Sequence, residues 1–245
     1  FEKKDAIAAT VHKTISKKFW AVVGSGPNKA AADEIRIKLS ELCYKTISAD
    51  IVENKKHIDL SAEPLILVCA AGSPQPVLED IAKDVAIFKA HKAAVVVFAP
   101  EGDRRFEGGA DAGVEIPASS GSGTLPVILN ALAGHRWGYY AACAIDAEAQ
   151  IFREFRNQLN GVLAAQTKAG YSLYEKISDV RMRGLVNNFY HTFNQHRNNG
   201  AFNLLGVKTI SDLALLMKYA AGKLPLDDFQ QEFKHEEGFT SPLDL

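Results

Sequence analysis

Short, continuous apolar runs recur along the first part of the chain, and segments with helical spacing separate most of them. Runs of this length without polar alternation are typical of strands that are buried on both faces. A parallel sheet covered by helices produces this order of elements. The sequence therefore predicts an α/β fold, a three-layer sandwich around a five-stranded, mainly parallel sheet. The expected strands are 19–23, 47–52, 65–69, 93–98 and 113–117.

The character of the sequence changes near Asp146. Beyond it no convincing strand run occurs, and apolar residues recur at helical spacing in four pieces. We expect a domain of residues 1–146 followed by an all-helical extension of residues 147–245. The helices expected in the first domain are 3–18, 28–43, 76–91 and 125–144, and those in the extension are 147–167, 170–197, 208–221 and 225–234.

The charges are nearly balanced, with 28 Lys and Arg against 29 Asp and Glu. That balance argues against a general nucleic-acid or membrane-surface binder, because such proteins usually carry a basic excess. No apolar run approaches the roughly 18 residues of a membrane span, and no signal peptide is visible. Cys43, Cys69 and Cys143 form no CxxC pair, so we expect neither a disulfide framework nor a zinc site, and a cytoplasmic location. The chain begins at Phe1 and ends abruptly, so we expect a piece of a longer polypeptide.

Gly24-Ser25-Gly26 follows the first expected strand and precedes a helix. Ligands of parallel sheets bind beyond the carboxyl ends of the strands, so this turn is a candidate binding site. The dinucleotide pattern requires a third glycine where Lys29 stands, and no P-loop Gly-Lys-Ser/Thr occurs. The turn is therefore either a substrate-binding loop of another kind or a purely structural turn.

A second candidate lies at the end of the following helix. Lys38 and Glu41 are three residues apart and share one helix face, and His57 follows sixteen residues after Glu41. Taken by spacing alone, these residues fit a solvated ion pair and a surface histidine. They also provide a carboxylate and an imidazole, which are the groups used for general acid–base chemistry near neutral pH.

The spacing of these residues resembles that in the second sugar isomerase (SIS) domain of the glucosamine-6-phosphate synthase family. The enzymes of this family are also called glutamine–fructose-6-phosphate transaminase (isomerizing). That family has a Gly-x-Gly turn, a Lys-x-x-Glu near the end of the next helix, a following tyrosine, and a Lys-His pair. Here these are Gly24–Gly26, Lys38–Glu41, Tyr44 and Lys56-His57. The resemblance covers about residues 18–146 and implies a flavodoxin-like SIS fold.

The resemblance implies an enzyme that converts fructose-6-phosphate, with ammonia from glutamine, to glucosamine-6-phosphate. Glu41 would move the proton between C1 and C2, and His57 would open the sugar ring from across a dimer interface. Lys38 would either stabilise the enolate or hold the charge balance of the active site. Gly24, Ser25 and Gly26 would contact the substrate. The implied partners are the sugar phosphate, the first SIS and glutaminase domains of the parent chain, and a second copy. Neither a metal nor an organic cofactor is implied, and neither nucleic acid nor a membrane is an expected partner.

The sequence also departs from the family. Ile58-Asp59-Leu60 replaces the usual Gly-Pro-Leu, and the phosphate loop Ser-x-Ser-Gly-x-Thr is absent after strand 65–69. Residues 119–124 approach that pattern after the wrong strand. The family holds the phosphate in its first SIS domain, so this chain alone is expected to be inactive. The alternative is a non-catalytic sugar-phosphate-binding or regulatory SIS domain with a helical interaction module, whose aromatic and basic stretch 189–197 forms either a contact surface or helix core.

Overall fold

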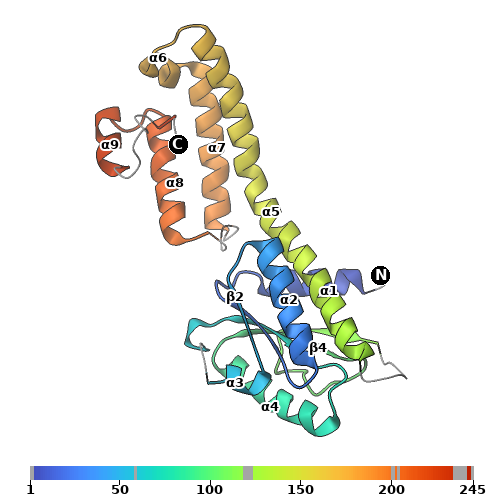
Figure 1. Ribbon diagram of the computed structural model, residues 1–245. Helices are drawn as coiled ribbons and strands as arrows, with labels where there is room; N and C mark the ends of the chain where they lie inside the picture. Colours follow the sequence, from blue (N-terminus) through green and yellow to red (C-terminus); the bar gives the residue numbers. More distant parts are fainter. Residues whose placement is uncertain are drawn as a thin grey trace. The chain divides into compact units, whose positions relative to one another are not determined.

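Five parallel strands form one sheet in the order β2-β1-β3-β4-β5 (Figure 1). Every residue of β1 and β3 is buried, because helices cover both faces of the sheet. This strand order is that of flavodoxin-like folds, so the predicted α/β sandwich is confirmed. The strands are β1 (Trp20–Gly24), β2 (Ile47–Asp50), β3 (Leu65–Cys69), β4 (Ala94–Pro100) and β5 (Ala112–Ile116).

The computed structural model describes residues 3–57, 60–117, 124–199, 202, 205–233 and 242–243. The chain divides into two compact units, Phe1–Asp146 and Ala147–Leu245. Residues 119–123 of the expected loop lie outside the described residues, whereas Thr124 is described. Ile58 and Asp59 also lie outside the described residues. In the part of the chain that is described, no helix has the length and apolar character needed to cross a bilayer.

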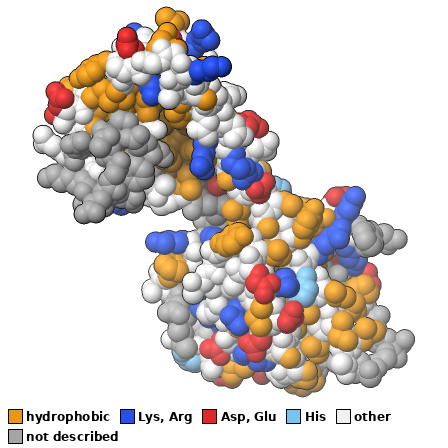
Figure 2. All heavy atoms as spheres, turned by 45° about the horizontal axis from the view of Figure 1, so that its top comes forward, with side chains coloured by type: hydrophobic (Ala, Val, Ile, Leu, Met, Phe, Trp, Pro, Cys, Tyr) orange, Lys and Arg blue, Asp and Glu red, His pale blue; other side chains and the backbone are white. Residues whose placement is uncertain are grey.

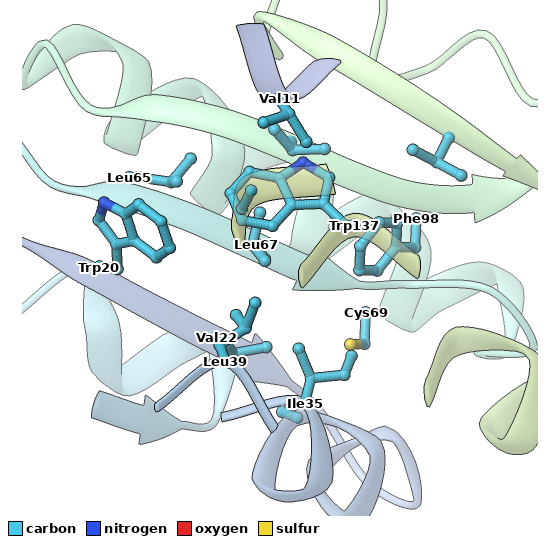
Figure 3. Close-up of a cluster of buried hydrophobic side chains, with 14 of the residues drawn as sticks. Val11, Trp20, Val22, Ile35, Leu39, Leu65, Leu67, Cys69, Phe98 and Trp137 are labelled. Carbon is cyan, nitrogen blue, oxygen red and sulfur yellow. The ribbon is translucent and has the colours of Figure 1, made fainter. Parts of the chain in front are cut away.

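Helices form the two outer layers of the first unit. α1 (Lys4–Thr14), α2 (Asn28–Cys43) and the first half of α5 (Leu125–Lys168) share a hydrophobic core with one face of the sheet. α4 (Gln75–Ala90) and the short α3 (Val52–Lys55) share a separate core with the other face. Figure 3 shows the first core, in which Trp20 and Trp137 lie near Leu67. The two indole rings meet edge to face with their centroids 5.5 Å apart.

α5 approaches α2 very closely at two glycines. A Cβ atom on Gly134 would lie 2.3 Å from Cγ1 of Ile35, and one on Gly138 would lie 2.7 Å from a methyl group of Leu39. Real Cβ atoms essentially never make contacts this short, so only glycine allows α5 to pack at this separation. The glycines therefore fix how α5 lies beside α2 on the sheet.

The second unit is helical throughout its described residues, as predicted. It contains the rest of α5, then α6 (Leu173–Ser178), α7 (Val180–Asn198), α8 (Val207–Ala220), the 3₁₀ turn η2 (Leu226–Asp228) and α9 (Phe229–Glu232). Phe189 and Phe193 of α7 are buried in its core, whereas His191 and Arg197 are exposed. The aromatic residues of the stretch 189–197 are thus helix core.

Two helix boundaries differ from the prediction. The helices expected at 125–144 and 147–167 are one continuous helix, α5, of 44 residues. The segment around Asp146 is rich in alanine and lacks glycine and proline, so nothing in it interrupts a helix. The helix expected at 170–197 instead breaks at Asp179. The Asp179 carboxylate accepts hydrogen bonds from the backbone N–H groups of Arg181 and Met182 and so caps α7.

Candidate functional site

The turn Gly24-Ser25-Gly26 ends β1 at the carboxyl edge of the sheet. Gly26 has φ +57°, a left-handed conformation that glycine adopts without strain. A Cβ atom on Gly24 would lie 2.3 Å from the carbonyl oxygen of Asn28, so the chain can turn directly into α2 only because this residue is glycine. Both glycines thus meet a structural requirement, and contact of the turn with substrate stays a prediction.

Two buried asparagines lie behind this turn. The Asn28 amide donates to the Ala71 carbonyl oxygen (3.0 Å) and to the Ser73 hydroxyl (3.2 Å). The Asn130 amide, from α5, donates to Asn28 Oδ1 (2.9 Å) and to the same Ala71 oxygen (3.0 Å). This network joins the turns after β1 and β3, the two strands between which the direction of the sheet order reverses. Sequence reasoning missed both residues, although an asparagine two positions after a Gly-x-Gly turn is a recognisable signal.

An acidic hollow of about 280 Å³ opens beside Ser25 and Gly26 at the same edge. Its charged lining residues are Glu53, Asp80 and Asp84. Lys56 joins two of them, with Nζ 3.1 Å from Asp84 and 3.4 Å from Glu53, and its pKa is raised chiefly by the hydrogen bond to Asp84. Asp80 pairs with Lys83 (2.9 Å), so two lysines offset part of the charge of the three carboxylates. The remaining negative charge disfavours binding of a phosphate group in the hollow.

Lys38 and Glu41 form the ion pair that their spacing predicts, with Nζ and Oε2 2.8 Å apart. The side chains are 37% and 58% exposed, so the Glu41 carboxylate is open to solvent. The pKa of Lys38 is raised, first by its hydrogen bond to Glu41 and then by the negative charges of Glu41 and Glu34. The pair lies in the last turns of α2, which starts at the carboxyl edge of the sheet and ends at the amino edge.

His57 lies in the turn after α3 and is exposed. The neighbouring Lys56 is paired with Asp84 of α4, so this segment belongs to the layer on the other face of the sheet from α2. One chain therefore does not bring Glu41 and His57 together. A site that uses both would need residues from two copies, which is the arrangement that the family resemblance implies.

Tyr44 follows α2 and is 94% exposed. Its φ is +51°, a left-handed conformation that costs a residue other than glycine about 1 kcal/mol. A left-handed residue at this position is a common helix end, so the end of α2 accounts for the backbone conformation of Tyr44. Within the described ranges, no group of three or more His, Cys, Asp or Glu side chains is placed to hold a metal ion.

Comparison with known proteins finds no family model that matches the chain, and no match among curated proteins. Two of the solved structures that are similar to the chain concern sugar phosphates. One is the C-terminal domain of glucosamine-fructose-6-phosphate aminotransferase from Francisella tularensis, with 15% identity and a TM-score of 0.49 over 58% of this chain and 40% of that one. The other, from Silicibacter pomeroyi, is described as a phosphosugar isomerase, with 16% identity and a TM-score of 0.45 over 62% of this chain and 48% of that one. The chain thus spans less than half of either protein.

Proposed function

We propose that the first unit is a SIS domain that supplies half of a sugar-phosphate active site in a glucosamine-6-phosphate synthase-like enzyme. The substrates would be fructose-6-phosphate and ammonia derived from glutamine. The observation that carries the proposal is the Lys38–Glu41 pair, an exposed carboxylate held 2.8 Å from an ammonium group in the register of the family motif. Tyr44, which is exposed and follows Glu41 by three residues, stands where the family has its tyrosine.

In the proposed reaction, the Glu41 carboxylate takes a proton from C1 of the open-chain sugar and returns it to C2. The electrons of the broken C1–H bond form the C1=C2 double bond of the intermediate, and negative charge moves onto the substituent at C2. When the double-bond electrons take the proton back at C2, the C1 hydroxyl loses its proton to that substituent and becomes the aldehyde carbonyl. Lys38 limits the accumulation of negative charge when the intermediate lies beside Glu41. His57 of the partner subunit would first transfer the proton of the anomeric hydroxyl to the ring oxygen, so that the ring opens.

The phosphate group would be held outside this chain. The turn after β3 lacks the hydroxyl-rich phosphate loop, and the hollow at the carboxyl edge is lined by Glu53, Asp80 and Asp84. A first SIS domain would supply the phosphate contacts, and a glutaminase domain would supply ammonia. The chain alone would therefore be inactive. Free cysteines at positions 43, 69 and 143 fit a reducing cytoplasm.

The test is a Glu41→Gln substitution in the full-length polypeptide. Loss of the carboxylate should lower the turnover of fructose-6-phosphate to glucose-6-phosphate or glucosamine-6-phosphate by about 10²- to 10⁴-fold. Glu34→Gln is the matched control, because Glu34 lies on the same helix and its carboxylate pairs with His135 (3.2 Å). Unchanged turnover in Glu41→Gln would rule out the proposed role.

A second candidate is a SIS domain that binds sugar phosphate without turning it over. The departures from the family pattern favour it: Ile58-Asp59-Leu60 stands where the family has Gly-Pro-Leu, and no phosphate loop follows strand 65–69. Calorimetric titration of the full-length polypeptide with fructose-6-phosphate and glucosamine-6-phosphate distinguishes the two. Binding that survives Glu41→Gln, together with no turnover in the unsubstituted protein, would support the non-catalytic domain.

A further inference from the structure

A hollow of about 400 Å³ lies in the second unit, between α5, the turn that follows it and the start of α7. We call it the α5–α7 hollow. Its floor includes the small residues Gly161, Ala165 and Ala169, which are spaced four apart on one side of α5. Small-molecule sites usually have volumes of roughly 300–1,000 Å³. Figure 2 shows charged and hydrophobic side chains together on the visible face of this unit, so surface composition alone does not mark a site.

Gly161 keeps the floor of the α5–α7 hollow open. A glycine inside a helix costs about 1 kcal/mol relative to alanine, so a glycine there calls for a reason. Gly134 and Gly138 of the same helix have one, because side chains of α2 fill the space where a Cβ atom would stand. At Gly161 no atom of the described residues lies within 4 Å of that position. Close packing within the described residues therefore does not explain Gly161, whereas room for a ligand does.

A buried amide at the α5–α7 hollow lacks one of its hydrogen bonds. Gln166 lines the hollow and is 5% exposed, and its Nε2 donates to the Lys176 carbonyl oxygen (3.1 Å). A carbonyl oxygen can only accept, so this bond fixes which end of the amide carries Oε1. Oε1 has no partner among the described residues, and an unsatisfied buried acceptor costs about 1–3 kcal/mol. Because Oε1 is covered from bulk water, a donor that enters beside Gln166 is the group that can satisfy it.

Two opposite charges stand at the rim of the α5–α7 hollow, where α7 begins. Asp179 accepts both of its hydrogen bonds, from the N–H groups of Arg181 and Met182, on Oδ1, so Oδ2 stays open within the described part of the chain. The exposed guanidinium of Arg181 has neither an ion pair nor a hydrogen bond to any described residue, Asp179 included. The rim therefore offers a carboxylate oxygen to a cationic group and a guanidinium to a carboxylate.

We propose that the α5–α7 hollow binds a free α-amino acid with an apolar side chain. An α-amino acid carries an ammonium and a carboxylate group on one carbon atom, which matches a rim whose two charged side chains are two residues apart. The ammonium group donates to Asp179 and to Oε1 of Gln166, and the carboxylate accepts from Arg181. The side chain of the ligand lies on the uncharged floor, against Val162 and Ala165.

The site lies wholly within the second unit, beyond residues 18–146 that resemble the family. It gives this unit a ligand-binding role that does not depend on the proposed reaction at Glu41. A ligand that binds the folded unit but not the unfolded chain stabilises the folded state by mass action. The thermal stability of the second unit therefore rises with the concentration of the amino acid.

The test is calorimetric titration of the 245-residue chain with L-leucine, L-valine, L-methionine and L-phenylalanine, together with thermal melts followed by circular dichroism. At least one of the four should bind with a Kd below about 1 mM and raise the Tm of the second unit. Two analogues separate the contributions of the charged groups. For a chain that binds L-leucine, 4-methylpentanoate lacks the amine and 3-methylbutylamine lacks the carboxylate, and each should bind at least about 10-fold more weakly.

Matched variants place the ligand in the α5–α7 hollow. Arg181→Gln should weaken binding at least about 10-fold, whereas Arg183→Gln, at an exposed position of the same helix outside the hollow, should not. Gly161→Leu fills the hollow and should abolish binding. Gly184→Leu is its control, because Gly184 also has no described atom within 4 Å of its Cβ position but does not line the hollow. Unchanged circular dichroism would show that the helices remain folded in each variant.

Three results would overturn the proposal. The first is the absence of binding by all four amino acids at millimolar concentrations. The second is binding that survives both Arg181→Gln and Gly161→Leu, because the ligand would then lie elsewhere. The third is 4-methylpentanoate binding as tightly as L-leucine, because the site would then recognise a carboxylate with an apolar tail rather than an amino acid.

Discussion

The close approach of α5 to α2 makes a prediction about Gly134. Replacing it by alanine puts a methyl group 2.3 Å from Cγ1 and 2.4 Å from Cδ1 of Ile35, where contacts of about 3.5–4.0 Å are favourable. Ile35 is fully buried, so its side chain cannot swing into solvent. The helices must separate by about 1 Å or Ile35 must leave its preferred rotamer.

Two effects of opposite sign set the magnitude. Alanine gains about 1 kcal/mol over glycine within a helix. Overpacking of a filled core costs about 1–3 kcal/mol, and a contact under 3.0 Å to three atoms of one side chain belongs at the upper end. We expect Gly134→Ala to destabilise the first unit by about 1–2 kcal/mol, which corresponds to a fall in Tm of about 2–8 °C for a unit of this size.

Tryptophan emission is the appropriate assay because both tryptophans, Trp20 and Trp137, are buried in the first unit. Gly161→Ala on the same helix is the control. No atom lies within 4 Å of its Cβ position, so it should stabilise the second unit by about 0.5–1 kcal/mol, seen by circular dichroism. In an Ile35→Ala background the cost of Gly134→Ala should disappear. An unchanged cost there, or stabilisation by Gly134→Ala alone, would refute the packing explanation.

Three further predictions concern other parts of the chain. Asn130→Ala removes the donor to Asn28 Oδ1 inside the buried network and should cost about 1–3 kcal/mol in urea unfolding followed by tryptophan emission. Ellman's reagent should find Cys143 reactive in the folded protein and the other two cysteines only after unfolding, because burial raises the pKa of Cys43 to about 11 and that of Cys69 further. The pKa of Glu175 is lowered from 4.5 by hydrogen bonds from the Ser172 N–H and hydroxyl, so its contribution to the stability of the second unit is complete above pH 4.5 and is lost as the pH falls below it. Glu175→Gln should reduce that acid-side loss in thermal melts.

The sheet could be predicted because its strands are buried on both faces and therefore form uninterrupted apolar runs, such as 65–69. The glycine-rich turn Gly24-Ser25-Gly26, directly after the first strand, predicted where the carboxyl edge of the sheet lies. The continuity of α5 escaped prediction because the boundary was inferred from a change in the type of element, and that change falls inside a helix. A compact unit can end in the middle of a helix when successive segments of that helix pack into different cores.

The candidate site was only partly accessible from the sequence. The spacing of Lys38 and Glu41 predicts an ion pair, and the structure contains it. Neither the network between Asn28 and Asn130 nor the acidic hollow could be foreseen, because each depends on residues far apart in the chain. Spacing also could not place His57 on the other face of the sheet from Glu41, since that depends on which side of the sheet α3 packs.

The strand order leaves β2 and β5 at the edges of the sheet, and both edges resist strand addition. β2 has only four residues and ends at Asp50. The Asp50 carboxylate accepts hydrogen bonds from the backbone N–H of Ile51 and from the side-chain amide of Asn54. On β5, the exposed Glu115 forms an ion pair with Lys3, the residue before α1. Short edges that carry charge disfavour growth of a sheet from chain to chain, and so protect against aggregation.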